Sequence, residues 1–88
     1  MIGSYCVVTT DKRGVFAGVL AEREDGKAVL TEARNCIYWS KETRGFLGLA
    51  ATGPMDGSRI GPPAPKTELV GVTSVTICTD EARARWEK

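Results

Sequence analysis

The residues best suited to bind a ligand are arginines and an aromatic side chain near the middle of the chain. Arg34, Tyr38 and Arg44 lie in the segment "RNCIYWSKETR", and Ser58 and Arg59 lie in a later stretch rich in glycine and proline. Aromatic faces can stack on bases, guanidiniums can form paired hydrogen bonds with phosphates, and glycine-rich turns can present backbone N–H groups. These residue types predict a binding site for a small nucleotide.

The groups that usually carry catalysis or bind metal ions are missing from this sequence. The chain has no histidine, and Cys6, Cys36 and Cys78 are widely spaced without a CxxC pair. Histidine is the commonest general base, and zinc sites need clustered cysteine and histidine ligands. We therefore expect no catalytic residue, no metal and no cofactor. Each cysteine lies in an apolar or β-branched stretch, which predicts three small buried side chains.

Length and composition narrow the class of protein. The chain has 88 residues, a formal charge of +1, 42% hydrophobic residues and 26% charged residues. This charge balance argues against a broad surface for bulk nucleic acid, and no apolar run is long enough to cross a bilayer. The first residues lack the pattern of a secretory signal. We expect one domain spanning residues 1–88, located in the cytoplasm, with no membrane partner and with a tendency to form homo-oligomers because a small chain buries little surface.

The first half of the chain has the alternation typical of strands. We expect strands at residues 4–10, 15–24 and 27–33, followed after a bend by a fourth at 34–40. Residues 11–14 are expected to form a turn, and Asp25 with Gly26 predicts a type I′ hairpin. The second strand is apolar on both faces, which indicates a central position in the sheet.

The second half of the chain predicts two short helices around one long strand. Ser40 or Thr43 could cap the first helix, which would end near Gly53. Residues 53–66 hold all four prolines and are expected to form a loop without ladder pairing. A continuous strand is expected over residues 67–79. Thr79 should then cap the last helix.

Helical spacing predicts which faces of the two helices are buried. Phe46, Leu47 and Ala50 should cover the sheet from the first helix, and Ala82 with Trp86 should pack the second. The expected fold class is therefore α+β. Its core should be a small bent antiparallel sheet, or a partly open barrel, of about five strands with two short helices.

Alternation along "RNCIYWS" assigns its residues to two faces. Arg34, Cys36, Tyr38 and Ser40 share one face, while Ile37 and Trp39 share the other. We expect Ile37 and Trp39 to anchor the strand in the core. The opposite face should then line a ligand groove with Arg34, Tyr38 and Arg44, closed by the loop around Ser58 and Arg59.

Several short motifs in combination carry a resemblance to a known group of proteins. These are "GVFAG" at residues 14–18, "VLTEAR" ending at Arg34, the pair Tyr38 and Trp39, "FLGLAATG", and "CTDEA" at residues 78–82. Together they resemble a family of small uncharacterised phage and prophage proteins over almost the whole chain. The resemblance implies an accessory role in phage infection.

Three functions remain open after these observations. The resemblance implies a phage protein that counters host antiviral defence, and the first possibility is a sponge that sequesters a nucleotide immune signal in an oligomer. The second is a protein-binding inhibitor of a host defence complex such as CRISPR. The third is an enzyme, for which the acid or base groups would be Glu42, Asp56 or Glu68 without any paired spacing. We rank the enzyme last.

Overall fold

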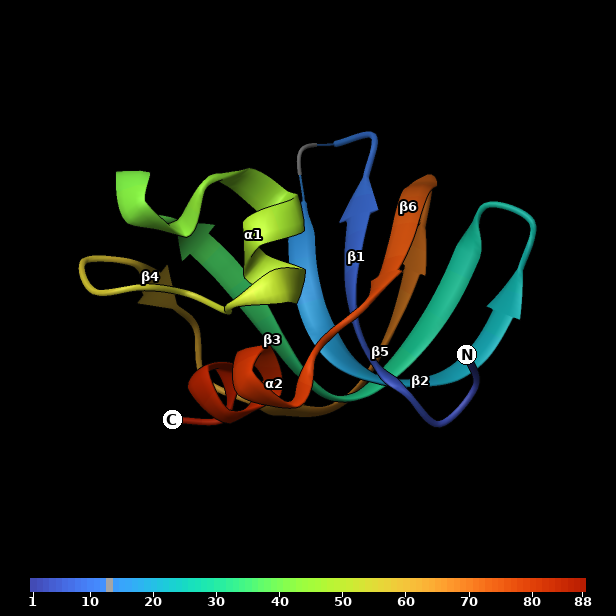
Figure 1. Ribbon diagram of the computed structural model, residues 1–88. Coiled ribbons are helices and arrows are strands. Elements are labelled where there is room, and N and C mark those ends of the chain that lie inside the picture. Colours follow the sequence, from blue (N-terminus) through green and yellow to red (C-terminus); the bar gives the residue numbers. More distant parts are fainter. Residues whose placement is uncertain (13) are drawn as a thin grey trace.

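The protein is a small α+β fold built on one antiparallel sheet that does not close on itself (Figure 1). The structure, a computed structural model, describes residues 1–12 and 14–88, so Arg13 of the expected first turn lies outside the described residues. Six strands form the sheet: β1 (Tyr5–Thr10), β2 (Val15–Glu24), β3 (Lys27–Tyr38), β4 (Arg59–Ile60), β5 (Ala64–Val70) and β6 (Val72–Ile77). A 3-10 turn η1 (Lys41–Thr43) and the helices α1 (Gly45–Ala51) and α2 (Asp80–Trp86) complete it. The predicted fold class is confirmed.

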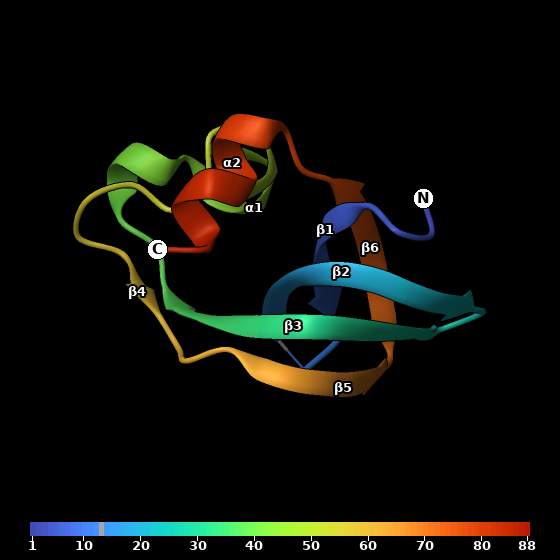
Figure 2. The same cartoon turned by 90° about the horizontal axis from the view of Figure 1, so that it is seen from below.

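The strand order explains why the sheet is bent. The strand order in the sheet is β4-β3-β2-β1-β6. Strands β5 and β4 pair with the same edge of β3, β5 with its first half and β4 with its end. A sharp turn at Gly71 then carries the chain from β5 to β6, which pairs with β1 at the other end of the sheet. Val72 N donates to Gly26 O of the β2–β3 hairpin over 3.1 Å. Figure 2 shows β6 crossing the direction of β3 and β5.

The long strand β3 replaces the two strands that the sequence predicted at 27–33 and 34–40. The expected bend is present as a β-bulge inside a single strand, because the β2–β3 register shifts between the pairs Ala17–Arg34 and Val19–Thr31. Glu32 adopts a φ of 52° at this point. A bulge puts one extra residue on one strand and increases its local twist, so pairing continues where the sequence suggested a break.

The region from residue 53 to 79 differs most from the sequence prediction. Two strands use the proline-rich segment, since β4 lies within it and β5 begins at Ala64. Pro65 is tolerated in β5 because an edge strand has one side without a ladder partner. The single strand expected over 67–79 is also wrong: Gly71, at a φ of 68°, separates β5 from β6. Leu69 is therefore buried while Ile77 is exposed.

Two hydrophobic cores lie on opposite faces of the sheet, and β1 contributes to both because its side chains alternate. The helix-side core lies under α1 and α2, and the sheet-interior core lies inside the bend. The helix-side core contains Tyr5, Val7, Ala17, Cys36, Leu49, Ala50 and Trp86. The sheet-interior core contains Cys6, Val8, Leu20, Ala28, Leu30, Ala33 and Leu69. Burial of each large apolar side chain stabilises the fold by about 1.5–3 kcal/mol.

Helix α2 forms as its sequence predicts. Thr79 caps it, with the Oγ1 atom accepting a hydrogen bond from Ala82 N over 3.0 Å. Ala82 and Trp86 are buried, and the indole Nε1 of Trp86 donates to Leu49 O over 3.0 Å. The indole is thus fixed against α1.

Helix α1 buries Ala50 as predicted, but it buries Leu49 in place of Phe46 and Leu47. Arg44 takes a left-handed conformation with a φ of 67° and separates η1 from α1, so the helical phase restarts at Gly45. Leu49 and Ala50 are buried as a result, whereas Phe46 and Leu47 are exposed. In the part of the chain that the structure describes, no helix is long and apolar enough to cross a membrane.

The predicted alternation does not continue to the end of β3, because the β3–β4 register shifts between Cys36 and Tyr38, and Ile37 and Tyr38 are both exposed. The covered face is also the opposite of the predicted one. Cys36 belongs to the helix-side core, whereas 64% of Ile37 is exposed. The helices cover the Cys36 side of the sheet, and the sheet-interior core reaches along β3 only to Ala33. The expected anchoring by Ile37 is therefore wrong. Trp39 lies beyond the strand and packs against the helix-side core.

The hairpin between β2 and β3 has the expected two-residue loop. Glu24 pairs with Lys27 across it, so Asp25 and Gly26 are the central residues. Gly26 has a φ of 71°, but Asp25 is not among the described residues with positive φ. The type I′ prediction is wrong, because that turn needs positive φ at both positions.

Candidate functional site

Arg34 is half-buried and is held by contacts with the chain itself. Its Nε atom donates to Gly61 O over 2.8 Å, and its Nη1 atom donates to Trp86 O over 2.7 Å. These bonds join β3 to the segment between β4 and β5 and to the end of α2. Neither bond uses Nη2, which leaves this side of the guanidinium for a different partner.

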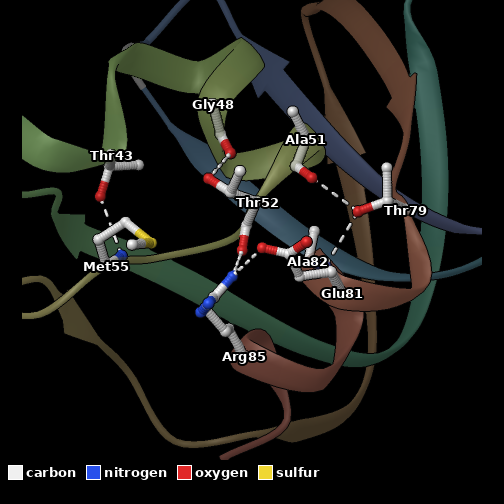
Figure 3. A network of polar contacts seen from close by, with 9 residues as sticks. All are labelled: Thr43, Gly48, Ala51, Thr52, Met55, Thr79, Glu81, Ala82 and Arg85. Carbon is white, nitrogen blue, oxygen red and sulfur yellow. Dashed lines mark hydrogen bonds and ion pairs between the residues drawn. The ribbon is translucent and has the colours of Figure 1, made fainter.

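Ser58 belongs to a cluster of three hydroxyl groups that fixes the proline-rich segment. Ser58 Oγ lies 3.1 Å from Thr43 Oγ1 and 3.3 Å from Ser40 Oγ, and it accepts from Ser40 N over 2.9 Å. Thr43 Oγ1 also accepts from Met55 N over 3.0 Å, as Figure 3 shows. The cluster lets the segment between α1 and β4 dock on η1 without unsatisfied polar groups at Thr43 and Ser58.

Tyr38 and Arg59 are neighbours across the β3–β4 pair. The two residues are aligned in the register of this short ladder, and both are exposed. Arg44 is also exposed, at the junction of η1 and α1. The structure thus pairs Tyr38 with Arg59, next to Ser58 in the chain. Arg34 lines a separate, smaller hollow on the side of Tyr5.

A hollow lies between the proline-rich segment and the end of α2, and we call it the loop hollow. Its volume is about 520 Å³. One of the five predicted site residues, Ser58, lines it. The full lining consists of Glu42, Pro54, Met55, Asp56, Gly57, Ser58, Ile60, Arg85 and Lys88. Figure 1 shows the gold segment that leads to β4 beside the red C-terminal helix.

The loop hollow combines both signs of charge with an apolar wall. Arg85 and Lys88 come from α2 and its end, while Glu42 and Asp56 come from η1 and the proline-rich segment. Arg85 is fixed in place because its Nη1 atom donates to Thr52 O over 2.6 Å and to Glu81 Oε2 over 2.5 Å (Figure 3). A cation held in this way loses little entropy when it binds an anion.

Sequence reasoning missed the cations of this hollow. In the terminal run "EARARWEK", Arg83 and Arg85 are interleaved with acidic residues, and this pattern predicts a solvated helix face. The available signal was the position of Arg85 directly before Trp86, which places it at the border of the buried face of α2. The sequence marks Glu42 and Asp56 only as possible acids or bases, and the structure brings both to the loop hollow. The third such residue, Glu68, lines a different hollow near the β2–β3 hairpin.

Comparison with known proteins places the chain in one family. A family model described as a domain of unknown function, DUF6948, matches residues 3–86. The chain belongs to the DUF6948 family. Neither a search of curated proteins nor a search of solved structures finds a match. The site of this DUF6948 domain is therefore characterised by its own geometry, namely by the loop hollow and the hydroxyl cluster.

The cysteines of this DUF6948 domain are held as neutral thiols. Burial raises the pKa of Cys36 to about 11 and that of Cys78 to about 12, and it also raises the pKa of Cys6. Because the thiolate is the nucleophile, a thiol with such a pKa is unreactive near neutral pH. Cys6 and Cys36 are buried as the sequence predicts, whereas Cys78 is only partly buried.

The described residues of the DUF6948 domain also lack a candidate metal centre. Among residues 1–12 and 14–88, no group of three or more cysteine, aspartate or glutamate side chains is close enough to hold a metal ion. The chemistry that the loop hollow offers is ionic and hydrogen-bonded recognition of a small polar molecule.

Proposed function

We propose that this DUF6948 protein is a phage accessory protein that counters host antiviral defence by sequestering a nucleotide immune signal. It acts without catalysis, in the cytoplasm of the host cell. The loop hollow is the observation that carries the proposal. Its volume of about 520 Å³ lies within the range of roughly 300–1,000 Å³ that is usual for small-molecule sites.

The lining of the loop hollow suits the parts of a nucleotide. Lys88 and the fixed guanidinium of Arg85 supply positive charge for a phosphate group. Pro54, Met55 and Ile60 offer an apolar wall for the face of a base. Hydrogen bonds from the base can then reach the carboxylates of Glu42 and Asp56, which line the same hollow.

Those carboxylates also select against long nucleic acids. Glu42 and Asp56 repel a continuous phosphate backbone, whereas a small ligand can direct its amino groups toward them. The overall charge of +1 agrees with this preference for a small ligand. The absence of histidine and the protonated thiols support capture rather than turnover.

Ligand release separates capture from turnover and tests this proposal. The purified protein is incubated with a panel of cyclic nucleotides and ADP-ribose derivatives, washed, and heated. We expect one class of nucleotide to return chemically unchanged. Replacement of a cation in the hollow, Lys88→Ala, should weaken capture at least tenfold, and Arg59→Ala beside the hollow should also weaken it. Lys66→Ala, on the exposed side of β5, is the matched control and should have no effect.

Two results would reject the proposal. If the wild-type protein retains no nucleotide, the loop hollow is not a nucleotide-binding site. Release of an altered nucleotide would show that the protein is an enzyme, and Glu42 and Asp56 would then be the first acid and base candidates.

Self-association is part of the proposed function. The described surface exposes Met1, Ile2 and Ile77, and residues near the start of β1 line a common hollow with Ile77. Burial of such side chains in a symmetric dimer would add apolar contact that a small chain lacks. Light scattering at micromolar concentration should give a mass above the 9.5 kDa of one chain. A mass of one chain would exclude this part.

A protein-binding inhibitor of a defence complex such as CRISPR is the second candidate. It is favoured by the exposed end of β3, where Tyr38 is 58% exposed beside Ile37. These residues line a hollow of about 340 Å³ with Val15, Cys36 and Trp39. If calorimetry shows no nucleotide binding, and Ile37→Glu abolishes retention of a defence component that the wild type retains, this function replaces the first.

A further inference from the structure

Tyr5 carries a buried hydroxyl group without a partner. The residue is only 5% exposed, and within the described residues its Oη atom is the one buried side-chain oxygen or nitrogen that makes no hydrogen bond. A buried hydroxyl left unpaired destabilises a protein, so nearly all such groups have a partner. The Oη atom of Tyr5 therefore keeps an unused capacity for hydrogen bonding among the described residues.

This side chain lines a hollow that contains other polar groups, which we call the tyrosine hollow. Its volume is about 250 Å³, and it is lined by Tyr5, Glu32, Arg34, Pro63 and Glu87. The hydrogen bonds of Arg34 to Gly61 O and Trp86 O fix its guanidinium but do not use Nη2. The hollow thus joins a fixed cation, a tyrosine and two carboxylates from separate parts of the chain.

Glu32 is brought to this hollow by the bulge in β3. Its φ of 52° lies in the left-handed region, where glycine and asparagine are preferred and glutamate is strained. The bulge depends on Gly18 in the facing strand, because a Cβ atom there would lie 2.7 Å from Thr31 O. Bulges redirect side chains near binding sites, and this one directs a carboxylate to the rim of the hollow.

Two further charged residues near Tyr5, Arg83 and Glu87, are of opposite sign and bond to each other. Arg83 lies over the ring, with 5.0 Å between its Cζ atom and the ring centroid, and its Nε atom donates to Glu87 Oε2 over 3.1 Å. Glu87 is therefore held in place at the hollow. Burial, with smaller effects of Cys78 and Glu87, raises the pKa of Tyr5 to about 12, so its hydroxyl keeps its proton.

We propose that the tyrosine hollow binds a small neutral or zwitterionic molecule that accepts hydrogen bonds at one end and donates them at the other. The accepting end meets Tyr5 Oη and Arg34 Nη2, and the donating end meets the carboxylates of Glu32 and Glu87. Two kinds of molecule have this chemistry: the lactam edge of a guanine base, and a free α-amino acid. The site is separate from the loop hollow and does not depend on the function proposed for it.

Ligand-observed NMR and calorimetry on the full chain can test this site with two sets of probes. One set is guanosine with adenosine as its control, and the other is a panel of free α-amino acids. We expect one set to bind the wild-type protein. Tyr5→Phe, which removes only the unpaired hydroxyl, should weaken that binding at least tenfold without unfolding the protein. Glu32→Gln should also weaken it at least tenfold, while Glu68→Gln on neighbouring β5 should leave it unchanged.

The outcomes distinguish binding at the tyrosine hollow from binding elsewhere on the protein. Binding of neither probe set at millimolar concentration would overturn the proposal, and the hydroxyl would then be satisfied by water alone. Equal binding by wild type and Tyr5→Phe would also overturn it. Guanosine binding that is lost in Lys88→Ala but kept in Tyr5→Phe belongs to the loop hollow, and would likewise exclude guanine as the ligand here. A failure of nucleotide capture at the loop hollow leaves these expectations unchanged.

Discussion

The hydroxyl cluster should be essential for docking the proline-rich segment, and Thr43→Val tests this directly. Valine keeps the shape of threonine but removes Oγ1, which bonds to Met55 N at 3.0 Å, to Ser58 Oγ at 3.1 Å and to Ser40 Oγ at 3.3 Å. Each such bond contributes about 1 kcal/mol net, and a buried donor that loses its partner costs about 1–3 kcal/mol. Since these bonds share one atom, we expect a total loss of about 2–4 kcal/mol.

Urea denaturation followed by circular dichroism measures this loss as a lower midpoint at constant slope. Thermal melting gives a second readout, because about 1 kcal/mol shifts the Tm of a domain of this size by roughly 4–8 °C. Hydrogen exchange should show that the Met55 amide loses protection before the strands do. The matched control is Thr73→Val, which removes an exposed hydroxyl bonded to Thr9 Oγ1 at 2.8 Å and should cost under about 0.5 kcal/mol. If Thr43→Val is as stable as this control, the cluster does not anchor the segment.

Two further predictions concern pH and the bulge. The pKa values of Tyr5, Cys36 and Cys78 in the folded protein, about 12, 11 and 12, lie above their ordinary values of 10, 9 and 9. The unfolded chain therefore loses these protons first, and stability that is full below pH 9 should fall as the pH rises through 9–12. For each group the loss is about 1.4 kcal/mol for every pH unit between its unfolded and folded pKa values. Urea titrations from pH 8 to 11.5 measure this decline of the free energy of unfolding, which should be smaller in Tyr5→Phe. A free energy of unfolding that does not change over this range would contradict the raised pKa values. Gly18→Ala should destabilise the protein by about 1–3 kcal/mol, because the added Cβ atom would lie 2.7 Å from the backbone oxygen of Thr31. Unchanged thermal stability of this variant would show that the bulge can move.

The local elements of this protein could be predicted from its sequence wherever neighbouring residues determine them. Thr79 caps α2 because its hydroxyl can reach the N–H group of Ala82 three residues later. The period of four between Ala82 and Trp86 places both on the covered face of α2. Alternation likewise identifies β1 and β2, and β2 is central as expected because it pairs with both β1 and β3.

Breaks and continuations of strands depend on contacts far apart in the sequence. Gly71 ends β5 because its positive φ turns the chain toward β1, although the β-branched pattern continues on both sides of it. Glu32 lies in the middle of β3 because pairing with β2 and β5 resumes after the bulge. Alternation alone predicts neither result, since it describes local side-chain direction and not which partner strand is present.

The sequence by itself determined an α+β fold with a bent antiparallel sheet, two short helices, buried cysteines at Cys6 and Cys36, and the residue types available for binding. Tertiary structure alone decided which face of "RNCIYWS" is covered, because α1 and α2 pack on the side of Cys36 and leave Ile37 exposed. It also decided which polar residues meet. Arg34 joins Tyr5 and Glu32 in one hollow, because β1 and β3 belong to the same sheet. Arg85 and Lys88 join Ser58 in another, because the end of α2 packs beside the proline-rich segment.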